Sequence, residues 1–185
     1  PIDVGAINYV VTAPTMSLYA VLALIWVVGV IALGGWTMVA ALAVSRLGRT
    51  ASTPAAETID IARAAAANLR LRSIPRIRVT DATSRPAVFG LIRPTVFLPP
   101  EIVNGDRDDL RHILLHEFAH IKRGDLPIHA VASVILILFW PNILAWYAMR
   151  LAGELRELCT DATVATLLRE QTPRYRATLL SAARA

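Results

Sequence analysis

Two histidines and a glutamate within five consecutive positions form the part of the sequence best suited to chemistry. His116, Glu117 and His120 belong to the pattern His-Glu-x-x-His. Residues four apart lie on the same face of a helix, so both imidazoles can bind one metal ion. The glutamate beside the first histidine can then act as general base toward a water molecule at that ion. The motif predicts a zinc-dependent hydrolase that uses one zinc ion, with Glu117 as the catalytic residue.

Zinc in a hydrolase needs a third protein ligand, and three downstream carboxylates are candidates. Glu157 and Asp161 are four residues apart, so they share one helical face. We expect Glu157 to bind the metal and Asp161 to accept a hydrogen bond from the far nitrogen of a ligating histidine. Glu154 is the alternative ligand, although a solvated ion pair with Arg150 is the simpler interpretation of its position.

Four other residues could bind a metal ion or stabilise an oxyanion, but structural roles explain them at least as well. His129 is a lone histidine in an apolar segment, and Cys159 is expected to be a small buried residue rather than a ligand. His112 and Tyr175 are candidates for stabilising an oxyanion, but packing or surface positions explain them as well. The single cysteine also excludes an internal disulfide.

Capping residues in the sequence indicate where the helices that position these side chains begin and end. Asp108 or Asp109 is expected to cap the helix that carries the motif, and Gly124 suits its C-terminal end. Asp125 is expected to cap the segment after it. Upstream, Thr53-Pro54 is typical of the start of a helix, which we expect to continue to about Leu71.

Between these two helices lies a short region with strand character. Strands are expected at 76–80, 87–91 and 95–98, with a turn at 91–94 that joins the last two. An extended peptide substrate could add to an exposed edge of this small sheet. We favour the strand that contains Ala87, Val88, Phe89 and Gly90 for that role.

The composition indicates that lipid is part of the environment. Apolar residues make up 55% of the chain and charged residues 18%, and the formal net charge of +5 comes from scattered arginines. Such scattering argues against direct nucleic-acid binding. Residues 15–45 predict a transmembrane helix, because no charge interrupts them. Arg46 and Arg49 follow at once, so residues 1–14 are expected outside the cytoplasm and residues 46–185 on the cytoplasmic side.

A second apolar segment, 126–149, creates a geometric conflict. A straight span there would place Glu157 on the opposite side of the membrane from His116 and His120. Pro141 resolves the conflict, because proline inside a helix breaks or kinks it. We therefore expect a broken helical hairpin, too short to cross the bilayer, whose return helix carries Glu157 back to the metal.

Beyond the metal motif, the sequence resembles a known family from about residue 15 to its end. These segments are similar to those of the membrane zinc peptidases of the BlaR/MecR type, which are β-lactam-responsive signal transducers. The family usually has a cysteine directly before the aspartate, where this chain has Thr160. The segments that carry the resemblance are His116 to His120, Lys122-Arg123-Gly124-Asp125, Trp140-Pro141-Asn142, Arg156-Glu157-Leu158-Cys159-Thr160-Asp161 and Pro86 to Pro99.

The resemblance implies an α+β membrane protein: an N-terminal transmembrane helix and a mostly helical, gluzincin-type zinc peptidase domain with a small β-sheet. It also implies a bacterial plasma-membrane enzyme that responds to a signal and cleaves a cytoplasmic repressor in an antibiotic response. The expected partners are a protein or peptide substrate, the lipid bilayer, and segments of the same protein on either side, since the chain starts at Pro1.

Two other functions stay open at this point. A membrane quality-control protease resembling HtpX or the CAAX-prenyl proteases would carry a full membrane hairpin between the motif and the glutamate. Here Glu157 follows His120 by 37 positions (157 minus 120), which favours the first function. A non-enzymatic membrane receptor with a structural zinc site is the other alternative, although such a site would not require Glu117.

Overall fold

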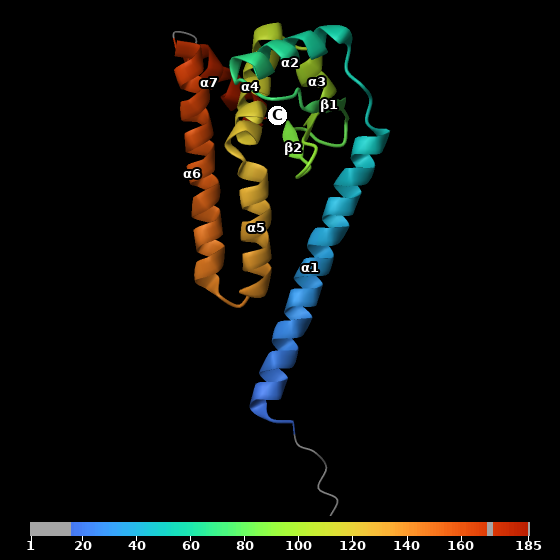
Figure 1. Ribbon diagram of the computed structural model, residues 1–185, viewed down its shortest axis with the longest axis vertical. Helices are drawn as coiled ribbons and strands as arrows, with labels where there is room; N and C mark the ends of the chain where they lie inside the picture. The colour runs from blue at the N-terminus through green and yellow to red at the C-terminus, as the bar shows by residue number, and fades with distance from the viewer. Residues whose placement is uncertain (1–15, 170–171, 185) are drawn as a thin grey trace, which may run out of the picture.

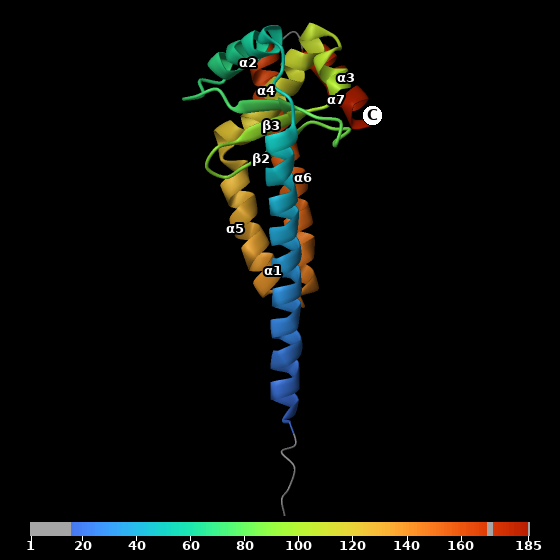
Figure 2. The same cartoon turned by 90° about the vertical axis from the view of Figure 1, so that its right-hand side faces the viewer.

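The computed structural model describes residues 16–169 and 172–184, which form a head and two apolar extensions (Figures 1 and 2). One extension is the single helix α1, Leu18–Thr50. The other is a helical hairpin of α5, Asp125–Leu138, and α6, Ile143–Leu168. Both leave the head on the same side (Figure 1). The flank predicted at residues 1–14 lies outside the described residues.

The head combines helices with a small three-stranded sheet, as the predicted fold class requires. In the sheet, β3 lies in the centre, parallel to β1 and antiparallel to β2. The strand β2 ends two residues earlier than predicted. The elements of the head are α2 (Ala56–Asn68), β1 (Arg76–Val79), β2 (Ala87–Phe89), β3 (Thr95–Leu98), α3 (Pro100–Val103), α4 (Arg107–Arg123) and α7 (Thr172–Arg184).

The helix α4 runs through the centre of the head and is packed on several sides. Its residues Leu114, Leu115 and Phe118 are almost completely buried. The alanines of α2, such as Ala62 and Ala65, are buried against this core, because small side chains let two helices approach closely. Burial on several sides fixes the rotation of α4 and hence the directions of its polar side chains.

Three predicted helix starts are wrong. Asp125 does not cap α5 but is its first residue, and Gly124 occupies the cap position. Asp106 caps α4, since its carboxylate accepts hydrogen bonds from the backbone N–H groups of Asp108 and Asp109, which lie in the first turn instead. These backbone hydrogen bonds lower the pKa of Asp106. The helix α2 begins at Ala56 rather than Thr53, because Ser52 exchanges backbone hydrogen bonds with Val79 and keeps the preceding chain extended.

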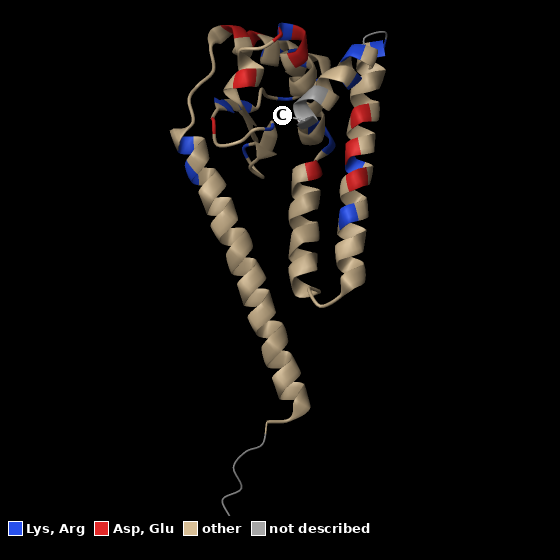
Figure 3. Cartoon of the chain, turned by 180° about the vertical axis from the view of Figure 1, so that it is seen from behind, with Lys and Arg blue, Asp and Glu red and all other residues tan. Residues whose placement is uncertain are grey.

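The helix α1 is the one helix among the described residues that is long and apolar enough to cross a membrane. None of its residues is buried within the chain. Its charged residues, Arg46 and Arg49, lie in its last two turns, at the end nearer the head. Figure 3 shows charged residues gathered on the head and on the adjoining part of α6, whereas the far ends of both extensions carry none.

The hairpin reverses where the sequence predicts a break. The helix α5 ends at Leu138, and the side chain of Asn142 caps α6 by accepting a hydrogen bond from the backbone N–H of Leu144. Pro141 lies in the turn between them. The helix α6 then runs back along α5 and contacts α4 in the head, which brings distant parts of the sequence together.

Candidate metal centre

His116 and His120 lie on consecutive turns of α4 with their imidazoles close together. The two Nε2 atoms are 3.3 Å apart, and the ring planes are nearly perpendicular at 80°. Both side chains are mostly buried, whereas Ile113 and Leu114 one turn earlier lie fully in the core. The packing of α4 therefore determines where both imidazoles point.

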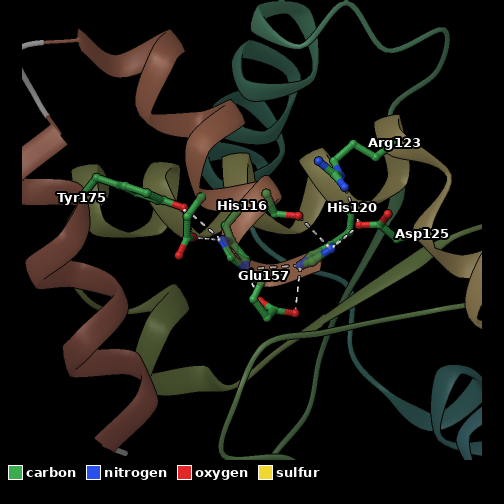
Figure 4. Close-up of polar contacts among 8 residues, drawn as sticks. His116, His120, Arg123, Asp125, Glu157 and Tyr175 are labelled. Atoms are coloured by element: carbon green, nitrogen blue, oxygen red, sulfur yellow. Dashed lines mark hydrogen bonds and ion pairs between the residues drawn. The ribbon is translucent and has the colours of Figure 1, made fainter. Parts of the chain in front are cut away.

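The return helix α6 brings Glu157 to the same place (Figure 4). Its Oε2 atom lies 3.4 Å from Nε2 of His116, and its Oε1 atom lies 3.8 Å from Nε2 of His120. Ligand atoms of the three residues all lie within 4.8 Å of one another. Glu154, the alternative ligand, pairs with Arg150 instead and is not part of this group.

These separations fit a tetrahedral zinc ion. With Zn–N bonds of about 2.0–2.1 Å, two ligands of a tetrahedron are roughly 3.3–3.4 Å apart. The two Nε2 atoms are separated by 3.3 Å, and the shorter contact of Glu157 measures 3.4 Å. Two imidazoles and one carboxylate also leave one position open, as catalytic zinc sites do. The donor set and its spacing therefore suit zinc.

The electrostatics of the site favour a bound cation. Burial alone would lower the pKa of His116, but the hydrogen bond with Glu157 and the nearby carboxylates of Glu117 and Asp161 outweigh it and raise that pKa. The same hydrogen bond is the largest of the effects that lower the pKa of Glu157. A site that holds a carboxylate ionised and stabilises positive charge on an imidazole would also stabilise a divalent metal ion.

The far nitrogen of His116 meets a carboxylate and a phenol. Its Nδ1 atom lies 3.1 Å from Oδ1 of Asp161, which also accepts a 2.8 Å hydrogen bond from the hydroxyl of Tyr175. That hydroxyl is 3.0 Å from the same Nδ1. Burial, followed by the hydrogen bond to Asp161, raises the pKa of Tyr175, so the phenol stays protonated.

His120 has a separate set of supports, which sequence reasoning missed. Its Nδ1 atom lies 2.8 Å from Oδ2 of Asp125, whose side chain is almost completely buried. Arg123 pairs with the same carboxylate oxygen at 3.5 Å, and Thr160 Oγ1 lies 3.3 Å from the imidazole. Gly124 makes this possible, because its positive φ of 76° ends α4 and lets α5 begin at the next residue. The sequence feature that could have indicated this contact is the position of Asp125, five residues after His120.

Glu117 lines a cleft next to the two histidines. Burial is the largest of the effects on this carboxylate and raises its pKa, while the two imidazoles partly oppose it. The cleft has a volume of about 620 Å³ and lies between the edge strand β2 and the start of α5. A carboxylate whose pKa is raised is a stronger base, which suits it to accept a proton and release it again. The neighbours of Glu117 along the cleft include Val88, Phe89, Gly90, Leu126, Ala130 and Glu157.

The remaining sequence candidates have different positions. His129 lines the cleft but is not among the residues with metal-ligand spacing. His112 and Tyr175 are both buried and pack edge to face, so neither is a surface residue. The hydroxyl of Tyr175 contacts the Nδ1 side of His116, away from the Nε2 atoms, which does not suit an oxyanion donor (Figure 4).

The prediction that Cys159 is buried is wrong. Cys159 is exposed, whereas the next residue, Thr160, is completely buried. The rotation of α6 is set by Glu157 and Thr160, both of which approach His120, and Cys159 falls between them on the outer side. The Thr160 side chain therefore occupies the inward position on this turn.

Comparisons with known proteins agree with this geometry. Residues 6–185 match the family described as BlaR1 peptidase M56. The chain is similar to the regulatory protein BlaR1 of Bacillus licheniformis, at 37% identity over 79 residues, which cover 43% of this chain and 13% of that protein. It is also similar to the methicillin resistance mecR1 protein of Staphylococcus aureus, at 26% identity over 106 residues, covering 56% and 18%.

The matched segments are therefore less than a fifth of the length of either relative. The family match, in contrast, extends over nearly the whole of the present sequence. Its peptidase description fits a chain in which two histidines and a glutamate from different helices meet with metal-ligand spacing. The chain belongs to the BlaR1 peptidase M56 family.

Proposed function

We propose that this chain is the catalytic core of a membrane-anchored zinc endopeptidase with its active site on the cytoplasmic face of a bacterial plasma membrane. The observation that carries the proposal is the convergence of His116, His120 and Glu157 beside Glu117 in an open cleft. Arg46 and Arg49 at the head end of α1 support the cytoplasmic orientation.

The side chains of this chain would divide the work of hydrolysis. Zinc, when bound by the two histidines and Glu157, would supply Lewis acidity toward a carbonyl group and activate water. Glu117 would accept the proton of the attacking water and pass it to the amine that leaves. Asp161 and Asp125 would hold the two imidazoles with Nε2 facing the metal, because each lies beside an Nδ1 atom.

An extended peptide is the substrate that the cleft supports best. The strand β2 is at the edge of the sheet, and its residues Val88 and Phe89 line the cleft together with Glu117. A peptide that pairs with this edge would place a backbone carbonyl beside the metal centre. The opposite edge of the sheet is less suitable, since β1 is bridged by Ser52.

The biological substrate we propose is a repressor protein cleaved in response to an antibiotic signal. The names of the two relatives support this proposal, since one is a regulatory protein and the other a methicillin resistance protein. Cleavage of a repressor would connect peptidase activity to such regulation. A housekeeping protease would instead cleave many unfolded membrane proteins without a signal.

The Glu117→Gln variant tests the enzymatic part of the proposal. The full protein, loaded with zinc, is incubated with a peptide library from a bacterial proteome, and new termini are counted by mass spectrometry. We expect the variant to keep its zinc while cleavage falls by about 10²–10⁴-fold, since a general base contributes that much. Glu154→Gln, an exposed carboxylate on α6, is the matched control and should cleave like the unmodified protein.

Two outcomes would contradict this function. Cleavage that is unchanged in Glu117→Gln would remove the proposed role of the base. Zinc binding without any cleavage by the unmodified protein, in either the presence or absence of the inducing antibiotic, would favour a receptor with a structural metal site. Broad cleavage without a signal would favour the quality-control protease.

A further inference from the structure

The hairpin segment 126–149 has an apolar surface that the rest of the chain does not cover. It comprises α5 from Leu126, the turn at 139–142 and the first two turns of α6, and it contains no Asp, Glu, Lys or Arg. Ile143 and Leu144, at the turn, are 81% and 74% exposed. A soluble helix would show one polar face toward water. The other large apolar residues exposed on this segment are Ile128, Val131, Val134, Ile135, Leu138, Phe139, Trp146 and Tyr147.

The length of the hairpin determines how deep it can reach. The 14 residues of α5 span ~21 Å at a rise of 1.5 Å per residue. A bilayer core is about 30 Å thick, so α5 cannot cross it. Because α6 returns alongside α5, both ends of the segment emerge on the same side as the head (Figure 1).

Backbone carbonyls at the turn accept hydrogen bonds from groups within the chain. The indole N–H of Trp26 in α1 donates to the carbonyl of Leu138 at 2.9 Å, and the indole of Trp146 donates to the carbonyl of Trp140 at 2.9 Å. The Phe139 carbonyl accepts from the backbone N–H of Asn142. Water would satisfy such carbonyls at an aqueous surface, whereas lipid cannot. Indole donors at these carbonyls therefore suit a turn surrounded by hydrocarbon.

The turn is also docked on the helix that can span the membrane. The indole N–H of Trp140 donates to the carbonyl of Trp26 at 3.2 Å, which pairs with the opposite bond from Trp26. Gly29 permits this contact, because any Cβ atom there would overlap the Trp140 indole. The turn thus lies beside α1 eight residues, or ~12 Å, from the start of that helix at Leu18. That position is within the charge-free part of α1.

From these observations we propose that segment 126–149 is a re-entrant hairpin whose surface is covered by lipid acyl chains. It would enter the leaflet on the side of the head, reach ~20 Å into the bilayer and leave on the same side. Arg150 pairs with Glu154 one turn further along α6, where long charged side chains can extend toward the headgroups. The metal centre, at the base of the hairpin, would then lie at the level of the headgroups.

Spin labels test this placement without relying on metal or catalysis. In a Cys159→Ser background, which leaves no other cysteine among the 185 residues of this sequence, Ile143→Cys is labelled with a nitroxide in this chain. The protein is reconstituted into phosphatidylcholine–phosphatidylglycerol vesicles. Oxygen concentrates in acyl chains, whereas a nickel chelate stays in water, so their collision rates with the label report depth. We expect oxygen to exceed the chelate several-fold at residue 143.

Two matched positions calibrate the measurement. Ile31→Cys, on an exposed position of α1, should give the same ratio as residue 143, and Glu101→Cys, on the head, should give the inverse ratio. A label at residue 143 that meets the chelate as often as the label at 101 would overturn the proposal. Low collision rates with both reagents at 143 would also overturn it, since a protein partner or second copy would then cover the hairpin.

Discussion

The candidate metal centre and the hairpin turn both provide hydrogen-bond partners for polar atoms, but they use different groups. The polar atoms are imidazole nitrogens in the first case and backbone carbonyls in the second. At the proposed metal site, carboxylates support the imidazoles: Asp125 for His120 and Asp161 for His116. At the turn, neutral indole N–H groups from Trp26 and Trp146 support backbone carbonyls. Charged partners suit a site that must hold a cation, whereas neutral partners suit one that faces hydrocarbon.

Removal of Glu157 should have the largest effect on the charged side of this comparison. In Glu157→Ala, two imidazoles would remain without an anionic ligand, so we expect zinc affinity to fall by more than the ~100-fold that loss of a supporting partner can cause. Chelator competition on the full protein measures this affinity. Glu154→Ala removes a carboxylate one turn away and should change nothing. Equal losses in the two variants would mean that Glu157 is not a ligand.

The two supporting carboxylates should differ in importance. Asp125→Asn and Asp161→Asn should each reduce zinc affinity by about 10–100-fold, because a neutral amide oxygen is a weaker acceptor for the imidazole N–H than a carboxylate. The side chain of Asp125 is 8% exposed and that of Asp161 is 45% exposed, so Asp125→Asn should have the larger effect. The same chelator competition ranks them. A larger loss of zinc affinity from Asp161→Asn would show that the hydrogen bond from Tyr175 to Asp161 matters more for zinc binding than the burial of Asp125.

A valine at residue 29 should disturb the hairpin and leave the metal centre intact. Gly29→Val forces the Trp140 indole away from α1, and overpacking of this kind costs about 1–3 kcal/mol. Thermal unfolding in detergent should show a lower midpoint, with unchanged zinc affinity. Gly34→Val is the control, because it makes the same change on the same helix with nothing within 4 Å. Equal destabilisation by both would indicate a helix-propensity effect alone.

The smallest expected effect concerns pH and His112. Burial lowers the pKa of this histidine below its usual 6.5, although Asp109 partly opposes the shift. The unfolded chain therefore binds a proton more readily than the folded one, and His112 should reduce stability as pH falls below about 6.5. A His112→Gln variant should lose less stability than the unmodified protein between pH 7.5 and 5.5. An identical pH dependence would exclude this contribution.

Local patterns were enough to predict the elements that carry the chemistry. The spacing of His116 and His120 predicts their shared helical face, and Pro141 within an apolar run predicts the reversal that α6 completes. The strands were also predictable, because alternating apolar residues and turn residues act over a few positions. These features depend on neighbours in the sequence, which a single chain displays directly.

Long-range contacts explain what could not be predicted. Tyr175 reaches Asp161 and His116 only because α7 packs against α4, and nothing near Tyr175 in the sequence indicates that contact. The helix start near Thr53 was wrong for the same reason, since the bridge to Val79 overrides the local capping signal. Cys159 and Thr160 are adjacent, so only the rotation of α6 in the fold decides which is buried.

Gly124 joins the two environments at one backbone position. The residue after it, Asp125, is both the first residue of the apolar helix α5 and the acceptor for the imidazole of His120. A rotation of α5 about this joint would lengthen or shorten that hydrogen bond. With the hairpin embedded as proposed, a change in bilayer thickness that tilts α5 would therefore alter the basicity of His120, the proposed zinc ligand, through a single carboxylate.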